Sequence, residues 1–159
     1  MSIYGYCRIS TAKQSIDRQI RNIKAEYPTA HIVQEAYTGT SIFRPEWLKL
    51  YRILKSGDTV VFDSVSRMSR NAEEGFALYE DLYHKGIRLV FLKEHHIDTE
   101  TYKKALSGSI AMTGTNVDFI LKGINEYLMA LAKEQIKLAF EQSEKEVADL
   151  HQRTREGLL

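Results

Sequence analysis

Cysteine, proline and net charge are all scarce in this sequence, and each shortage narrows what the protein is. A single cysteine among 159 residues, Cys7, rules out a disulfide within the chain and fits an intracellular location. The 22 basic and 21 acidic residues leave a net charge of +1, so any nucleic-acid-binding surface must be local. No apolar run approaches the ~18 residues of a membrane-spanning helix, and no signal peptide is expected. The two prolines, Pro28 and Pro45, punctuate the chain.

The sequence signatures of common cofactors are also missing. The chain holds no G-x-x-x-x-G-K-[ST] loop, no G-x-G-x-x-G motif and no G-x-S-x-G elbow. No histidine, cysteine or carboxylate group has the spacing of metal ligands, and the adjacent His95 and His96 favour a loop or edge position. We therefore expect no cofactor and no metal. A Ser-His-Asp hydrolase stays open, although no histidine is marked for that role.

What the sequence does contain is an alternation of strand and helix patterns over its first hundred residues. The predicted strands are 3–10, 30–37, 59–63 and 87–92; the helices run from Ser15 to Pro28, from Pro45 to about 55 and from Asn71 to Gly86, with loops at 38–44 and 64–70. The second helix is expected to bury Trp47, Leu48, Tyr51 and Leu54. This alternation predicts an α/β fold with a doubly wound, mainly parallel sheet.

A long helix is predicted after the α/β region. Apolar residues continue at three- and four-residue spacing: Val117, Leu121, Ile124, Leu128, Leu131, Ile136, Ala139, Phe140, Val147 and Leu150. An unbroken helix to Gly157 is about 60 Å long, although Gly123 permits a break or kink. Because helices of this length are usually oligomeric, burial against a second subunit is favoured over folding back onto the sheet. The expected division is a catalytic domain at 1–114 and a helical region at 115–159.

Polar residues gather where the predicted strands end. On the first strand, Arg8 and Ser10 share a face with Tyr4 and Tyr6, while Cys7 faces the core. The next strand ends lead to hydroxyls and arginines with few carboxylates: Thr38, Arg44, Ser64, Ser66, Arg67, Ser69 and Arg70. Ligands of parallel sheets bind outside the carboxyl ends of the strands, and the arginine fork pairs with two phosphate oxygens. These residues predict a site for a phosphate ester or diester.

Four sequence blocks, in order, carry a resemblance to a known family. YGYCRIST followed by QSIDRQ, then TGTSIFRPEW, VFDSVSRMSRNAEEG and HQRTREGL, resembles the catalytic N-terminal domain of the resolvase/invertase family of serine site-specific recombinases from mobile elements. The resemblance spans nearly the whole chain. It implies a resolvase-like α/β domain followed by a long C-terminal helix. The segment 97–130 is longer than in compact resolvases.

The resemblance implies a role for each matching residue. Ser10 matches the nucleophile that attacks a DNA phosphodiester and forms a 5′-phosphoserine bond. The arginines that hold the scissile phosphate are matched by three residues: Arg8, Arg67 and Arg70. Other catalytic or supporting polar residues are matched by Gln14, Gln19, Thr38 and Arg44. Arg153 and Arg155 match DNA-contacting positions on the long helix.

The resemblance also implies partners and a location. The partner is a double-stranded DNA recombination site, bound by a homodimer that becomes a tetramer in the synaptic complex. Strand cleavage and rejoining would need neither metal nor ATP, in the bacterial cytoplasm with the nucleoid and away from membranes. A DNA-binding region is expected after residue 159. Two other functions stay open, a small phosphate-ester hydrolase using the same arginines and a non-enzymatic oligomerisation module.

Overall fold

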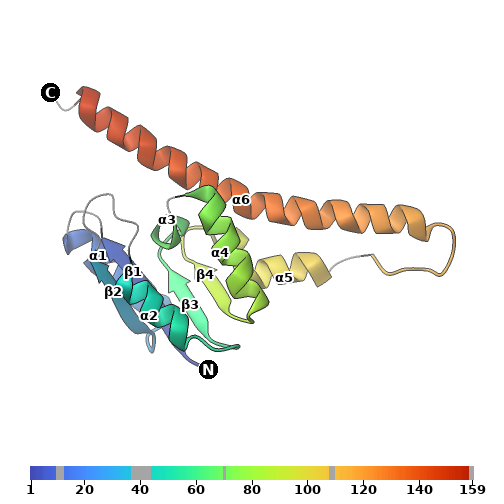
Figure 1. Ribbon diagram of the computed structural model, residues 1–159, viewed down its shortest axis with the longest axis horizontal. Helices are drawn as coiled ribbons and strands as arrows, with labels where there is room; N and C mark the ends of the chain where they lie inside the picture. Colours follow the sequence, from blue (N-terminus) through green and yellow to red (C-terminus); the bar gives the residue numbers. More distant parts are fainter. Residues whose placement is uncertain (10–12, 37–43, 70, 108–109, 158–159) are drawn as a thin grey trace.

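Strands and helices alternate along the chain and lead into one long helix (Figure 1). The computed structural model describes residues 1–9, 13–36, 44–69, 71–107 and 110–157, without the side chains of 9, 13–15, 144 and 146–157. The elements are β1 (Ile3–Ile9), α1 (Lys13–Glu26), β2 (His31–Ala36), α2 (Pro45–Ile53), β3 (Thr59–Phe62), α3 (Val65–Met68), α4 (Ala72–His84), β4 (Arg88–Phe91), the 3-10 turn η1 (His95–Ile97), α5 (Thr99–Ser107) and α6 (Asp118–Gly157). Within these ranges, no helix is both long and apolar enough to cross a membrane.

The described strands form one parallel sheet in the order β2-β1-β3-β4. The first strand lies inside the sheet, and the chain winds outward from it on both sides, to β2 in one direction and to β3 and β4 in the other. This is the doubly wound α/β fold that the sequence predicts. The observed β2 begins one residue later than predicted, β3 ends one residue earlier, and β4 is shorter by one residue at each end. The predicted ends of the first two strands, at residues 10 and 37, lie outside the described residues.

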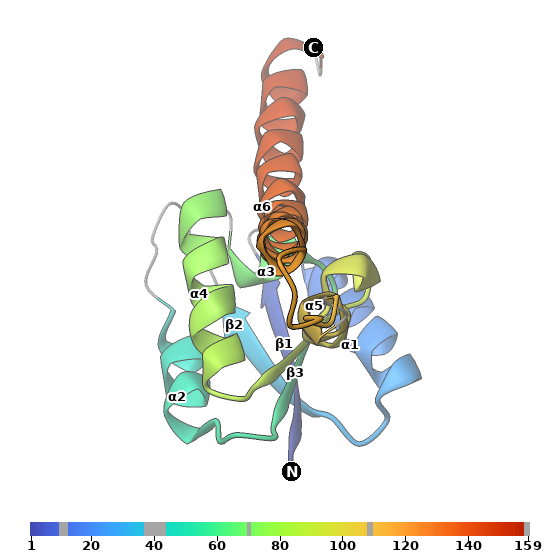
Figure 2. The ribbon, with the colours of Figure 1, turned by 90° about the vertical axis from the view of Figure 1, so that its right-hand side faces the viewer.

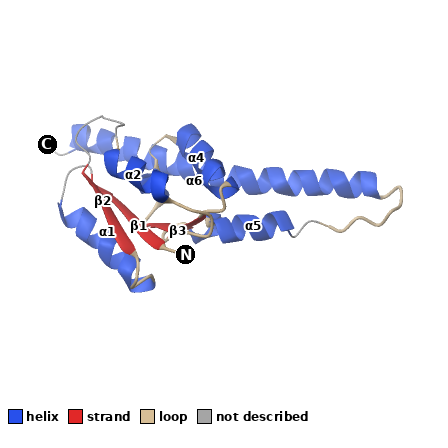
Figure 3. Cartoon of the chain, turned by 60° about the horizontal axis from the view of Figure 1, so that its bottom comes forward, coloured by secondary structure: helices blue, strands red, loops and turns tan. Residues whose placement is uncertain are grey.

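Side chains alternate across β1 and supply two separate cores. Tyr6 packs on the face covered by α2, α4 and α6, whereas Cys7 packs on the face covered by α1. Figure 3 shows α1 on one side of the strands and α2 and α4 on the other. Cys7 is fully buried, and its burial raises the pKa of the thiol to about 12. The prediction that Cys7 faces the core is confirmed.

Two local predictions are wrong. Leu48, which was expected to be buried, is 43% exposed, and Leu50 is buried in its place. The reason is that α2 turns the side that carries Trp47 and Leu50 toward the sheet. The segment predicted as a loop at 64–70 contains the one-turn helix α3. A helix of four residues is too short to show a periodic pattern in the sequence. Its first N–H group, that of Val65, is bonded to Glu94, which is distant in the sequence.

The long helix α6 is continuous through Gly123 and presents apolar side chains on two different faces. Its middle packs on the body of the protein through Ile136, Ala139 and Phe140, which are buried. The residues nearer its N-terminus project beyond the sheet, and many of their apolar side chains are exposed (Figures 1 and 2). The apolar pattern that reads as one stripe in the sequence is therefore divided between intrachain packing and an open surface.

The contact between α4 and α6 depends on a glycine. A Cβ atom built on Gly75 would lie 2.5 Å from Cδ1 of Phe140, inside any normal carbon–carbon distance. Phe140 in turn packs edge-on against Phe91 of β4. The missing side chain at Gly75 thus lets α6 approach α4 closely enough to seat Phe140 in the core.

Replacing this glycine should loosen α6. We expect Gly75→Ala to lower the free energy of unfolding by about 1–3 kcal/mol, the usual cost of overpacking a core. Gly123→Ala is the matched control, because it is also a glycine inside a helix but has no neighbouring atom within 4 Å. That variant should gain up to ~1 kcal/mol from helix propensity. Urea denaturation measures both, and equal effects would contradict the packing role of Gly75.

Candidate active site at the carboxyl edge of the sheet

Arg8 lies near the end of β1, beyond the last residue of β1 that pairs with β3. The pairing of β1 with β3 ends at Tyr6, so the backbone groups of Arg8 on that side need another partner. The amide of Gln19 supplies it. Its Oε1 accepts from the Arg8 N–H at 3.1 Å, and its Nε2 donates to the Arg8 carbonyl at 3.0 Å. Gln19 thus acts as a one-residue substitute for a strand and fixes α1 against the end of β1.

Three arginines converge on the short helix α3. The Arg8 guanidinium donates to the Ser66 carbonyl at 2.6 Å, and that of Arg44 donates to the Met68 carbonyl at 2.5 Å. Arg67, between these two carbonyls in the chain, donates to the carbonyl of Arg8 at 3.4 Å. These contacts join the ends of β1 and β3 to the start of α2. They bring together residues that the sequence placed on separate strand ends.

The position of α3 is fixed from outside the helix. Both carboxylate oxygens of Glu94, which follows β4, accept from the Val65 N–H at 3.1 and 3.2 Å. The hydroxyls of Ser64 and Ser66 lie 2.6 Å apart and share a hydrogen bond. Glu94 therefore acts as a cap for α3 from the far side of β3.

A buried carboxylate, Glu35, lies at the same edge and was missed by the sequence analysis. It is 1% exposed and accepts hydrogen bonds from the Tyr6 hydroxyl (3.2 Å) and from the backbone N–H groups of Trp47 (3.0 Å) and Glu46 (3.3 Å). The N–H groups of Glu46 and Trp47 lie in the first turn of α2, where the helix itself offers them no acceptor. Burial, with the nearby Glu35 charge, raises the pKa of Tyr6 far above its usual value, although Arg44 and Arg8 oppose that shift.

The expectation of few carboxylates at the first three strand ends is therefore wrong, because Glu35 and Asp63 both lie there, whereas Glu94 follows the fourth strand. Besides Glu35 and Glu94, the buried Asp63 ends β3, accepts from the Asn22 amide at 3.0 Å and pairs with Lys93 at 3.4 Å. Each carboxylate has hydrogen-bond donors at short range, which is how charges persist in a protein interior. They offset part of the arginine charge. The signal was present in the sequence, since Glu35 and Asp63 end or follow strands, but it did not say which carboxylates face inward.

A polar cavity of about 350 Å³ opens beside α3, under α6. Its lining mixes hydroxyls, charged groups and an amide: Ser64, Val65, Ser66, Arg67, Lys93, Glu94, His96, Ala139, Gln142 and Ser143. Arg67 links this cavity to the arginine group. Within the described residues, no three His, Cys, Asp or Glu side chains gather as metal ligands.

The structure gives a place to only some of the predicted site residues. It brings together Arg8, Gln19, Arg44 and Arg67. Ser10, Thr38 and Arg70 lie outside the described residues. Gln14 is on α1, and Arg153 and Arg155 are on α6, at positions where the backbone alone is described. The site roles of these residues stay predictions.

The arrangement suits an anion with several oxygens. Planar guanidinium groups from three different elements meet at the carboxyl edge of a parallel sheet, where such folds bind ligands. Each guanidinium already donates to a backbone carbonyl, so binding an anion would cost little further loss of side-chain freedom. The fold is an α/β domain, and guanidinium groups at this edge have the geometry to pair with the oxygens of a phosphate group.

Comparison with known proteins makes this specific. The family model for the resolvase N-terminal domain matches residues 3–146, and the chain belongs to this family of serine site-specific recombinases. The transposon Tn21 resolvase of Escherichia coli is 27% identical over 159 residues, covering 96% of this chain and 83% of that protein. A resolvase of Clostridium perfringens is 32% identical over 99 residues, covering 61% and 52% respectively. A resolvase family site-specific recombinase from Streptococcus pneumoniae superposes with a TM-score of 0.48 at 20% identity, covering 98% of this chain and 99% of that one.

The clamp formed by Gln19 can be tested by its stability effect. Gln19→Leu leaves the buried N–H of Arg8 without its partner and should lower the free energy of unfolding by roughly 2 kcal/mol or more. Gln34→Leu on β2 is the control, because that glutamine is exposed. Chemical denaturation of both variants gives the comparison. Equal stability of Gln19→Leu and the parent would contradict the clamp.

Proposed function

We propose that this chain is the catalytic part of a site-specific DNA recombinase in which Ser10 is the nucleophile. The observation that carries the proposal is the convergence of Arg8, Arg44 and Arg67 on α3. In the sequence, Ser10 comes directly after Ile9, the last residue of β1. Family membership supplies the class of reaction. The substrate is the phosphodiester of a double-stranded recombination site, and Arg70, Gln14 and Thr38 complete the pocket.

The proposed chemistry is a transfer of the phosphoryl group without net hydrolysis. The Ser10 hydroxyl gives up its proton as its Oγ bonds to phosphorus, the bond from phosphorus to the 3′ oxygen breaks, and that oxygen leaves as a hydroxyl, so that the net proton transfer is from Ser10 to the 3′ oxygen. A 5′-phosphoserine remains, and the 3′-hydroxyl of a new partner reverses the step. A serine hydroxyl is a weak nucleophile. Preorganised guanidinium charge stabilises both the developing alkoxide and the charge of the transition state.

The loss of the nucleophile gives the direct test. The protein is incubated with supercoiled DNA carrying its recombination site, denatured, and examined for a covalent protein–DNA product. Ser10→Ala should abolish that product, whereas Ser56→Ala, in the exposed turn at the opposite edge of the sheet, should not. No product from the parent at any site would contradict the proposal. Phosphate release from small esters without a product would favour the hydrolase alternative.

The proposal divides the chain into a catalytic region, 1–114, and a helical region, 115–159, that dimerises and crosses the DNA. At 1.5 Å per residue, the 40 residues of α6 reach about 60 Å. Among the α6 residues whose side chains are described, the buried ones are Ile136, Ala139 and Phe140 in the middle of the helix. The proposal assigns the C-terminal part, with Arg153 and Arg155, to DNA. Two such dimers would form the tetramer that exchanges strands.

The surface proposed for dimerisation is the outward face of α6. Its exposed apolar residues recur at three- and four-residue spacing, beginning just before the helix: Val117, Ile120, Ile124, Tyr127 and Leu131. All five are between 38% and 65% exposed. Such spacing matches the seam of a helix pair. The preceding segment is held in place, because the Asn125 amide bonds both backbone groups of Ile110 and Asp118 accepts from the N–H groups of Thr113 and Gly114.

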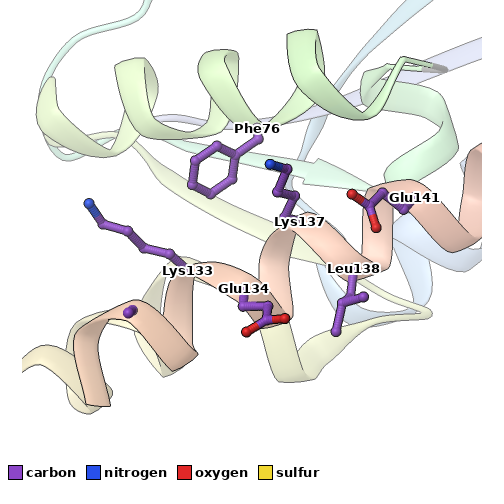
Figure 4. A pocket seen from close by; sticks show the side chains of 7 residues that line it. Phe76, Lys133, Glu134, Lys137, Leu138 and Glu141 are labelled. Atoms are coloured by element: carbon purple, nitrogen blue, oxygen red, sulfur yellow. The ribbon is translucent and has the colours of Figure 1, made fainter. Parts of the chain in front are cut away.

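A groove extends this outward face toward α4. It encloses about 470 Å³, and its apolar part comes from Phe76 of α4 with Ala130 and Leu138 of α6. Figure 4 shows the Phe76 ring directed toward α6, with Lys133 and Lys137 along the same helix. Lys133 pairs with Glu80 of α4 at 3.7 Å. The outward face and the groove together form an apolar strip with charged margins, which suits a second copy of the chain.

A charge placed on the outward face should separate the subunits. Ile124→Lys puts an ammonium in the proposed interface and should convert dimer to monomer, measured as mass by analytical ultracentrifugation. Glu126→Lys introduces the same side chain about 200° around the helix and should leave the dimer intact. A parent that is a strict monomer at high concentration, or equal masses for both variants, would contradict this surface.

A further inference from the structure

The carboxylate of Glu35 has a place in the site that its neighbours define. Arg44 is the residue directly before the first turn of α2, and Glu35 accepts from two N–H groups of that turn, those of Glu46 and Trp47. The Arg44 side chain reaches back over the Tyr6 ring, with its Cζ 6.0 Å from the ring centre. Tyr6 donates to the same Glu35 carboxylate. One buried group therefore holds both the backbone start of α2 and the ring beneath the Arg44 guanidinium.

Glu35 also lies beside Arg8. Residues 8 and 35 are direct partners in the register of β1 and β2, so the two charges share the same sheet edge. Adjacent strands of a sheet lie about 4.8 Å apart, and unit charges on neighbouring buried residues interact appreciably because solvent screening is weak there. A carboxylate here lowers the positive potential that the arginines present to an anion.

We propose that Glu35 is a positioning and selectivity residue of the recombinase site, which fixes Arg44 beside Arg8 and keeps the arginine group from binding free phosphate. The part of this inference that concerns formation of the covalent DNA product rests on the proposed function. A small anion is attracted only by the local positive potential of the arginines, and the carboxylate of Glu35 lowers that potential. A DNA phosphodiester is brought to the site by the rest of the duplex and needs Arg44 in its correct place.

The chain carries its own reporter for this site. Trp47 is the sole tryptophan, its backbone N–H is bonded to Glu35, and its ring packs edge-on against Tyr6 with centres 5.2 Å apart. Its emission should respond to an anion that binds beside Arg44. Titration with inorganic phosphate, followed by Trp47 fluorescence, measures binding without DNA and without Ser10 chemistry.

Two substitutions separate charge from position. Glu35→Gln removes the charge and should tighten phosphate binding on the order of tenfold, while slowing formation of the covalent DNA product. Glu35→Asp keeps the charge but draws the carboxylate back by one methylene, so phosphate binding should match the parent while product formation slows. Glu100→Gln is the control, because it removes an exposed carboxylate that pairs with Arg88 at the opposite edge of the sheet, and it should change neither quantity.

The outcomes decide the matter in both directions. Unchanged or weaker phosphate binding in a folded Glu35→Gln variant would overturn the inference and leave Glu35 as a helix cap alone. Product formation at the parent rate in both Glu35 variants would also overturn it. If the parent itself forms no covalent product, the proposed function fails, while the phosphate titration still tests the effect of Glu35 on the arginine group.

Discussion

The hydrogen bonds between arginine side chains and the carbonyls of α3 are the contacts on which the rest of this site depends. Like-charged guanidinium groups repel one another, so they gather only where acceptors hold each in place. A single turn of helix supplies two such acceptors, Ser66 and Met68, and contributes Arg67 itself. Because the turn follows β3 and is capped by Glu94 after β4, the sheet determines where the arginines meet.

The surroundings of this cluster show how its charge is balanced. Glu35 and Glu94 accept hydrogen bonds from backbone N–H groups at the starts of α2 and α3, and Asp63 accepts from the side-chain amide of Asn22. Structural carboxylates therefore double as counter-charges to the arginines. The arginines therefore gather at one edge of the sheet although the net charge of the whole chain is only +1.

The long helix combines two roles that the fold separates along its length. Its middle is committed to the body, where Gly75 admits Phe140, and its N-terminal part offers apolar side chains that nothing in the described chain covers. Because adjacent positions on a helix point about 100° apart, one continuous rod can bury one face in its own domain and present another to a partner. Attachment to the body and the proposed assembly with a second subunit would then use the same helix.

The sequence by itself determined the order of the four strands and of the helices α1, α2, α4 and α6, together with the two faces of β1, because these follow from local periodicity; α5 (Thr99–Ser107) was not predicted. It also placed Arg8, Arg44 and Arg67 at one sheet edge, since parallel strands end together. Only the tertiary structure decided that α3 is a helix, that Leu50 rather than Leu48 is buried, and that Gln19 replaces a strand beside Arg8. The position of Glu35 between Tyr6 and α2 was decided in the same way. Each depends on partners far away in the chain, so no local pattern encodes it, and their positions become fixed only when the sheet assembles.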